Sequence, residues 1–325
     1  MRKSVVIVGD SPLALLVGRL LDRNLARESH IEVIHITRDD SFIYAPHITS
    51  LLGKHSFPSK SGLYNNISYR KTTVKQINLI DRRVITTGGV IDYDSLFLDL
   101  TPSFLSPEIT KISQQASRLI NEIKAKINSG RQVRARVTFA GEDAMSWQMA
   151  LALSSDVSAC PVAVQRALIV QAQYPNISKL KDFLAENGVV SRKSVAPLPG
   201  LTIYTPTAPL KNRLVRGALL DEKDNFVLRD TLNPEGHPET IIVDSSNRHQ
   251  QDLLRVDQTL AVQIKSNMER FLAGDRQKSI SSPRSSGILK GQNNNFVWIG
   301  NLQSSHLRAK LISALDHKFY RQLIA

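Results

Sequence analysis

Cysteine is almost absent from the sequence, since Cys160 is the only one in 325 residues. A single thiol excludes an intrachain disulfide, a paired-cysteine redox centre and a thiolate-rich metal cage. Long apolar runs are also missing: no stretch reaches the roughly 18 residues needed to cross a bilayer, and no signal-peptide core follows Met1. We therefore expect a cytoplasmic protein.

Runs of like charge are missing too, although the formal net charge is +13. Arginine and lysine occur singly or in small groups, such as those at 131–136 and 308–321. A positive protein attracts anionic partners in general, including nucleic acid, acidic lipid and phosphorylated ligands. Because the charge is dispersed, it favours a solvated basic surface over a nucleic-acid groove.

The sequence does contain two copies of a strand–glycine–helix pattern. Ser4–Val8 is a short apolar run that leads through Gly9 into an apolar-periodic stretch at Leu13–Leu25, and Ile31–Thr37 is rich in β-branched residues. These runs predict a strand, a tight turn, a helix and a second strand. The pattern recurs at Val137–Leu153, which predicts an α/β protein with two Rossmann-like dinucleotide-binding units.

Other elements are predicted between and after these copies. A meander of short strands is expected over Tyr69–Asp99, with Gly88-Gly89 as a hairpin turn. A polar helix is expected at Lys111–Asn128 and an amphipathic helix at Asn176–Asn187, each closed by a nearby glycine. The Ser- and Arg-rich stretch Gly274–Gly287 indicates a flexible connection to the C-terminal residues.

The first turn is a weakened dinucleotide-binding loop. Such a loop uses one glycine for the bend, a second for the approach of the pyrophosphate and a third for helix packing. Here Gly9 keeps the first position, Ser11 occupies the second, Pro12 follows, and Ala14 is a tolerated third residue. Asp10 adds an unfavourable negative charge beside a bound diphosphate.

The end of the second strand lacks the acidic residue that holds a ribose hydroxyl in such units. Thr37 and His35 are the polar residues available there as weak substitutes. His35 alternates with apolar neighbours, so we interpret it as a structural strand residue, and no metal constellation surrounds it.

The second turn departs further from the pattern. Gly141 keeps the first position, but Glu142 and Asp143 place two acids where a phosphate would lie, and Ser146 stands at a later glycine position. Trp147 is interpreted as a core residue rather than a stacking ligand. Binding of NAD(P)H is therefore not expected at this turn.

The order of the segments resembles that of flavin-dependent pyridine nucleotide oxidoreductases, and most of all their type II NADH dehydrogenase (NADH:quinone oxidoreductase) branch. The segments VVIVGDSPLALLVGRLL, FIYAPHITSLLG and VKQINLIDRRVITTGGVIDYDSLFLDLTPS are similar to the first flavin turn, the aromatic–Pro segment containing Pro46, and the hairpin of that family. Leu219–Asn247 resembles the stretch whose aspartate, here Asp244, bonds the flavin ribityl chain. Ile264–Ser279 and the final strands extend the likeness over nearly the whole chain.

This resemblance implies a domain organisation and a cofactor. Residues 1–110 and 211–273 would form a discontinuous FAD-binding-like domain, 111–210 an NAD(P)-binding-like domain, and 274–325 a short C-terminal α+β piece. FAD is the implied cofactor, and no metal is expected. The candidate cofactor-binding residues are Gly9, Ser11, Pro12, Ala14, Thr37, Pro46, Gly141 and Asp244.

Two functions stay open. In the first, the chain is a flavin-dependent oxidoreductase of the quinone-reducing type, for which no catalytic residue is identified. The resemblance implies this type because the disulfide-reductase and sulfide-oxidising branches of the family require cysteine pairs. Alternatively, it is a catalytically inactive relative, a pseudoenzyme that serves as a binding or assembly module through its basic surface. The loss of loop glycines favours the second function, because apolar patterning maintains a fold independently of its site.

The C-terminal residues suggest a partner in either case. Large apolar side chains recur every four residues from Leu307 to Leu323 among arginines and lysines, which predicts a basic amphipathic helix. This stripe fits either peripheral contact with an anionic membrane on its inner face or packing against the rest of the chain. A homo-oligomer or a protein partner is also expected.

Overall fold

The structure is a computed structural model of the whole chain. It describes residues 2–28, 30–52, 56–101, 105–128, 136–140, 144–158, 167–171, 178–192, 201–204, 214–244, 258–280, 286–291, 294–299, 302–304, 314–318 and 320–321.

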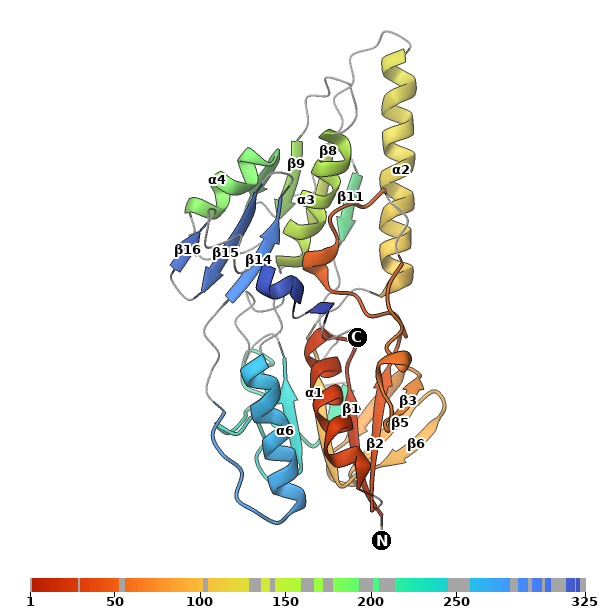
Figure 1. Cartoon of the computed structure of the whole chain (residues 1–325), viewed down its shortest axis with the longest axis vertical. Helices are drawn as coiled ribbons and strands as arrows, with labels where there is room; N and C mark the ends of the chain where they lie inside the picture. The colour runs from red at the N-terminus through yellow and green to blue at the C-terminus, as the bar shows by residue number, and fades with distance from the viewer. Residues whose placement is uncertain are drawn as a thin grey trace.

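A five-stranded parallel sheet forms the first unit, in the lower half of Figure 1. Its strand order is β13 (Thr240–Val243), β7 (Ser95–Asp99), β1 (Lys3–Val8), β2 (Ile31–Thr37) and β3 (Ser68–Lys71). Helix α1 (Pro12–Arg23) connects β1 to β2, as the sequence predicts. Strand β13 comes much later in the sequence than β7, yet the two strands pair in parallel. The predicted Rossmann-like architecture is therefore present.

Both faces of this sheet are covered, because side chains alternate between two apolar clusters along each strand. Val5 and Ile7 of β1 point to α1 and α6 (Gln258–Leu272), which lie side by side in Figure 1. Val6 and Val8 point to the opposite face, where they meet a second, smaller sheet. This explains why the strands are continuous apolar runs rather than alternating ones.

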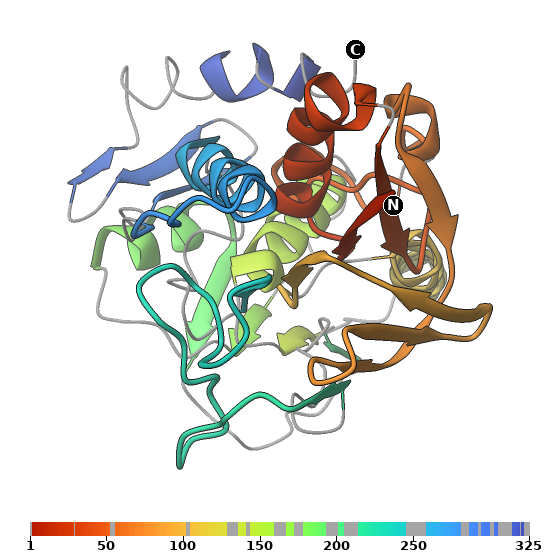
Figure 2. The same cartoon turned by 90° about the horizontal axis from the view of Figure 1, so that it is seen from below.

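The smaller sheet contains the predicted hairpin, visible beside the first sheet in Figure 2. Its order is β12 (Val215–Arg216), β4 (Val74–Asn78), β5 (Arg83–Thr86) and β6 (Gly89–Asp92), with antiparallel pairing from β4 to β6. The predicted meander is wrong at both ends. Strands β3 and β7 pair in parallel with β2 and β1, so they belong to the first sheet and only β4–β6 form a meander.

The second unit, in the upper half of Figure 1, repeats the parallel plan. Its sheet has the order β10 (Val189–Arg192), β9 (Ala167–Gln171), β8 (Arg136–Ala140) and β11 (Leu201–Tyr204). Helices α2 (Ser106–Asn128), α3 (Ala144–Ser158) and α4 (Ser178–Glu186) belong to this unit, together with the antiparallel sheet of β14 (Ser286–Lys290), β15 (Asn295–Ile299) and β16 (Leu302–Ser304). Helix α2 begins earlier than predicted, at Ser106, because Pro107 is tolerated in a first helical turn.

Helix α3 lies at the junction of these parts and is buried on every side. Eight consecutive residues are buried, from Trp147 to Ser154. The core interpretation of Trp147 is therefore correct. A helix that is apolar all round is typical of a central, fully enclosed position.

Gln148 is a buried polar residue of this helix, as is Ser154, and it joins three segments. Its Nε2 donates to the Ile48 carbonyl at 3.1 Å and the Lys290 carbonyl at 3.3 Å, and its Oε1 accepts from the Lys290 N–H at 3.0 Å. From the other end of α3, Asp156 accepts the N–H groups of Leu51 and Leu52. The segment after β2 and strand β14 are thus fixed to one helix.

Part of the C-terminal stripe is described. Residues 314–318 and 320–321 are helical, and Leu315 is 54% exposed. The inward contacts come from other positions: the Tyr44 hydroxyl donates to Asp316 at 2.6 Å, and the Tyr320 ring stacks on His47. Leu307, Leu311, Phe319 and Leu323 lie outside the described residues. Within the described ranges, no helix combines the length and the hydropathy needed to span a membrane.

Replacing Gln148 with leucine should destabilise the protein by about 2 kcal/mol or more. The leucine has a similar volume but leaves buried backbone groups of Ile48 and Lys290 without their hydrogen bonds. Urea unfolding measures the loss. Gln114→Leu, on the exposed side of α2, is the matched control. Equal midpoints for the two variants would show that Gln148 is not a structural tie.

Candidate functional site

The turn between β1 and α1 is set by close packing around Gly9. A Cβ on Gly9 would lie 2.9 Å from the Cβ and carbonyl oxygen of Asp99 and 3.1 Å from the Cβ of Ala14. Gly9 also has a positive φ of 156°, and its N–H donates to the Ile36 carbonyl at 3.2 Å. Only glycine fits where the ends of β1 and β7 and the start of α1 meet. The predicted role of Gly9 in the bend is consistent with this geometry.

Ser11 caps helix α1. Its Oγ accepts the N–H groups of Leu13 at 3.1 Å and Ala14 at 3.2 Å, and the hydroxyl donates to the Asp99 carboxylate. Pro12 begins the helix at a position where its missing N–H costs nothing. The N–H groups that point toward a pyrophosphate in a dinucleotide loop are therefore occupied by a side chain of the turn itself.

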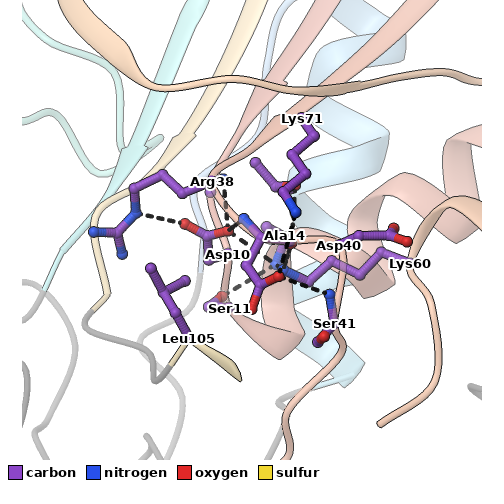
Figure 3. Close-up of polar contacts among 12 residues, drawn as sticks. Asp10, Ser11, Ala14, Arg38, Asp40, Ser41, Lys60, Lys71 and Leu105 are labelled. Atoms are coloured by element: carbon purple, nitrogen blue, oxygen red, sulfur yellow. Dashed lines mark hydrogen bonds and ion pairs between the residues drawn. The ribbon is translucent and has the colours of Figure 1, made fainter. Parts of the chain in front are cut away.

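Asp10 is held in a cage of positive groups, shown in Figure 3. Its carboxylate accepts the Arg38 N–H and Nε–H, each at 2.9 Å, and the Lys60 ammonium at 3.3 Å. The Asp10 side chain is only 6% exposed. Burial would raise the pKa of this carboxyl, but Lys60 and Arg38 outweigh it and hold the pKa below its usual range. The charge that looks unfavourable in the sequence is thus neutralised inside the chain.

Lys60 reaches Asp10 from a loop, residues 56–63, which we call the strap and which runs antiparallel to the segment after β2. Its backbone N–H donates to the Asp40 carbonyl at 2.6 Å, and its ammonium also donates to the Asp39 carbonyl at 2.8 Å. The Asp40 carboxylate accepts from the hydroxyls of Ser59 and Ser61. Burial lowers the pKa of Lys60, and Asp10 partly restores it.

His35, on the neighbouring strand β2, is a structural residue that binds the backbone of the turn at Gly9. Its Nε2 lies 3.0 Å from the Gly9 carbonyl and its Nδ1 lies 2.6 Å from the Tyr64 hydroxyl, so Nε2–H donates and Nδ1 accepts. Burial lowers the pKa of His35 to about 4, against the opposing hydrogen bond to Gly9. The imidazole is therefore neutral at physiological pH. Among the described residues, no group of three or more His, Cys, Asp or Glu side chains could hold a metal ion.

The remaining predicted residues are not all brought to the turn. Thr37 is at the end of β2, but its hydroxyl is engaged with the Asp39 carbonyl at 3.1 Å and the Tyr69 hydroxyl at 2.6 Å. Asp244 follows β13 directly and is fully buried. Pro46 is buried in a single helical turn, Ala45–His47, that packs on the second unit. Gly141 lies outside the described residues, as do Glu142 and Asp143.

The residues at the first turn do not fit a dinucleotide diphosphate. A diphosphate needs free N–H groups at the helix start and a positive potential. Ser11 takes the N–H groups of Leu13 and Ala14, and the carboxylates of Asp99 and Asp10 lie at the ends of the two adjacent strands. Asp244 follows a different strand, β13, so the misfit concerns the first turn.

Sequence reasoning missed the partners that close this turn. In the sequence Asp99 marks only a strand end, and neither Lys60 nor Arg38 is a candidate. Arg38 follows β2 immediately and Asp99 ends β7, so their meeting at the carboxyl edge of the sheet follows from strand order. Lys60 carries no such signal, because it comes from a loop 50 residues after Asp10.

The His35 contacts predict that acid destabilises the protein. The pKa is lower in the folded state, about 4, than in the unfolded chain, about 6.5, so unfolding takes up a proton between these values. Stability should be full above pH 6.5 and fall as the pH decreases to 4, with His35 contributing on the order of 3 kcal/mol. Thermal unfolding across this range measures the profile.

His35→Gln is the test variant, because an amide can keep both hydrogen bonds without titrating. Its profile should be shallower than that of the wild type, though not flat, because burial also lowers the pKa of His47, to about 3. His30→Gln, at an exposed histidine, is the control and should keep the wild-type profile. Superimposable profiles for all three proteins would contradict the assignment.

Comparisons with known proteins identify the fold. No protein-family model matches the sequence, and no curated protein matches it. Among solved structures, the sulfide:quinone oxidoreductase of Aquifex aeolicus matches with a TM-score of 0.68 at 13% identity, over 99% of this chain and 91% of that one. A chain in the Tetrahymena thermophila mitochondrial ATP synthase matches with a TM-score of 0.60 at 13% identity, over 99% and 93%. Reduced Bacillus anthracis CoADR-RHD matches with a TM-score of 0.56 at 12% identity, over 97% and 63%.

These likenesses span nearly the whole chain, so they concern the order of both parallel units and the C-terminal sheet. The chain therefore has the fold of these solved structures, an α/β fold with two Rossmann-like units and a short C-terminal piece.

Proposed function

We propose that this chain is a catalytically silent relative of the FAD- and NAD(P)-dependent oxidoreductases, and that it acts as a structural module within a protein assembly. The observation that carries the proposal is the set of contacts at the first turn. Ser11 accepts hydrogen bonds from the N–H groups at the start of α1, and Asp10 binds the side chains of Arg38 and Lys60. A turn that is filled by its own side chains keeps its shape without a cofactor.

The solved structures support an assembly role by example. One chain with this fold is part of a mitochondrial ATP synthase, and the likeness covers 99% of the present chain and 93% of that one. The fold is therefore compatible with service inside a large complex. Fold alone does not specify activity, so the state of the site weighs more than the oxidoreductase neighbours.

The composition points the same way. The single cysteine excludes the paired-thiol chemistry of disulfide reductases. Flavin is then the redox group on which any oxidoreductase activity of this chain would depend. A net charge of +13 gives the surface a general preference for acidic partners. Both features suit a binding module, and neither requires turnover.

One observation favours the second candidate, a flavin-dependent oxidoreductase. Asp244 is buried at the carboxyl end of β13, in the place where the resemblance puts a contact with the flavin ribityl chain. In this candidate FAD would supply the redox chemistry and Asp244 would help to hold it. The filled diphosphate half of the site opposes it.

The purified full chain is expected to be colourless and to bind no added FAD. Bound flavin absorbs visible light, so an absorption spectrum followed by a titration of FAD, monitored by flavin fluorescence, tests this directly. Flavin that co-purifies in near-stoichiometric amount, or saturable binding of added FAD, would overturn the proposal and favour the oxidoreductase.

The assembly half is tested in the native cell. A tagged full-length chain, extracted under mild conditions and separated by native electrophoresis, should migrate in a complex of defined composition and well above the size of a monomer. Gln148→Leu provides the control, since a destabilised chain should enter that complex less. A wild-type chain that migrates only as a monomer would contradict an assembly role.

A further inference from the structure

The contacts of Asp10 have the form of an anion receptor. The groups that bind its carboxylate are donors: the N–H groups of Arg38 and Asp39, the Arg38 guanidinium and the Lys60 ammonium. Two of these donors carry a positive charge, and the cage lies beside the start of α1, where the helix dipole adds partial positive charge. Amides and cations that converge on one point make a site for a phosphate oxygen as well as for a carboxylate.

We propose that this cage is a latent phosphate site that Asp10 plugs. The carboxylate of Asp10 is a tethered anion in the place of a ligand's phosphate, and it keeps these donors from binding phosphorylated compounds. The inference rests on the proposed silent function, and it explains how that state is maintained at this turn.

The central donor of this receptor is Lys60, whose side chain is only 2% exposed. A buried ammonium requires an anionic or strongly polar partner. Besides Asp10, the ammonium donates to the Asp39 carbonyl. Loss of the Asp10 charge would leave a buried cation without its anionic hydrogen-bond partner, and a mobile anion that reaches it would replace the missing charge.

The strap and the backbone donors of the receptor are held in place independently of Asp10. The Lys60 N–H donates to the Asp40 carbonyl, and the Phe42 N–H donates to the Pro58 carbonyl at 2.7 Å, so the strap is tied to the segment after β2 through its backbone. The Arg38 N–H is held by its position directly after β2, and the Lys60 ammonium is held by the Asp39 carbonyl. Removing the carboxylate charge should therefore leave these donors in place with their positive charge uncompensated.

Asp10→Asn is the test variant, since its neutral amide holds the two cations much more weakly than the carboxylate does, so that a mobile anion can displace it. The probe is inorganic diphosphate, and the readout is the thermal unfolding temperature as the concentration rises. The wild type should not respond, whereas Asp10→Asn should be stabilised and should bind diphosphate about tenfold or more tightly than the wild type. If Asp10→Asn is recovered unfolded, refolding with diphosphate should restore it.

Two controls make the result specific. Asp40→Asn also removes one negative charge near the strap, but the Asp40 carboxylate accepts its hydrogen bonds from serines of the strap, so this variant should gain no response. Asp10→Asn combined with Lys60→Met should lose the response, because the buried cation is gone. The proposal is wrong if Asp10→Asn neither responds nor is rescued, if Asp40→Asn gains the same response, or if the wild type responds as strongly.

The outcome is distinct from that of the flavin test. Flavin in the wild-type protein would overturn the silent function whatever diphosphate does to Asp10→Asn. A colourless wild type with an unresponsive Asp10→Asn would keep the silent function and remove the plug.

Discussion

The close approach of three chain segments at Gly9 is the constraint on which the first unit depends. The end of β1, the start of α1 and the end of β7 meet there with no space for a side chain, since a Cβ at this position would lie 2.9 Å from Asp99. This contact fixes where α1 starts and therefore which of its faces covers the sheet. Nothing in it requires a ligand, so the turn can lose its phosphate contacts while the fold persists.

The polar groups around this contact have been satisfied internally. In a liganded dinucleotide turn the helix N–H groups are completed by the phosphate. Here Ser11 completes them, and Asp99 in turn accepts the Ser11 hydroxyl. Buried polar groups must find partners inside a protein, since each one left unpaired costs about 1–3 kcal/mol. A turn that provides its own partners does not depend on cofactor for that part of its stability.

The sequence predicts the architecture well where the pattern is local. The alternation of apolar runs and turn residues correctly indicates β1, α1 and β2, and Gly88-Gly89 correctly marks the β5–β6 hairpin. It fails at β3 and β7, because a short strand does not reveal whether it will pair in parallel with a distant neighbour or antiparallel with an adjacent one. The sequence order of the whole chain, rather than any single motif, carried the correct fold.

The candidate site is harder to predict for the same reason. Read locally, Ser11 only removes space from the loop, but its capping role is completed by Asp99, 88 residues away. In the sequence alone, Asp10 reads as an unfavourable negative charge at the turn, but in the structure Lys60 and Arg38 lie beside it and balance that charge. Local sequence gives the identity of a charged residue, whereas its effect depends on which opposite charges the fold brings to it. A substitution that looks like damage to a ligand site can therefore be one half of an internal pair, and the presence of its partner separates a turn that has been refilled from one that has merely decayed.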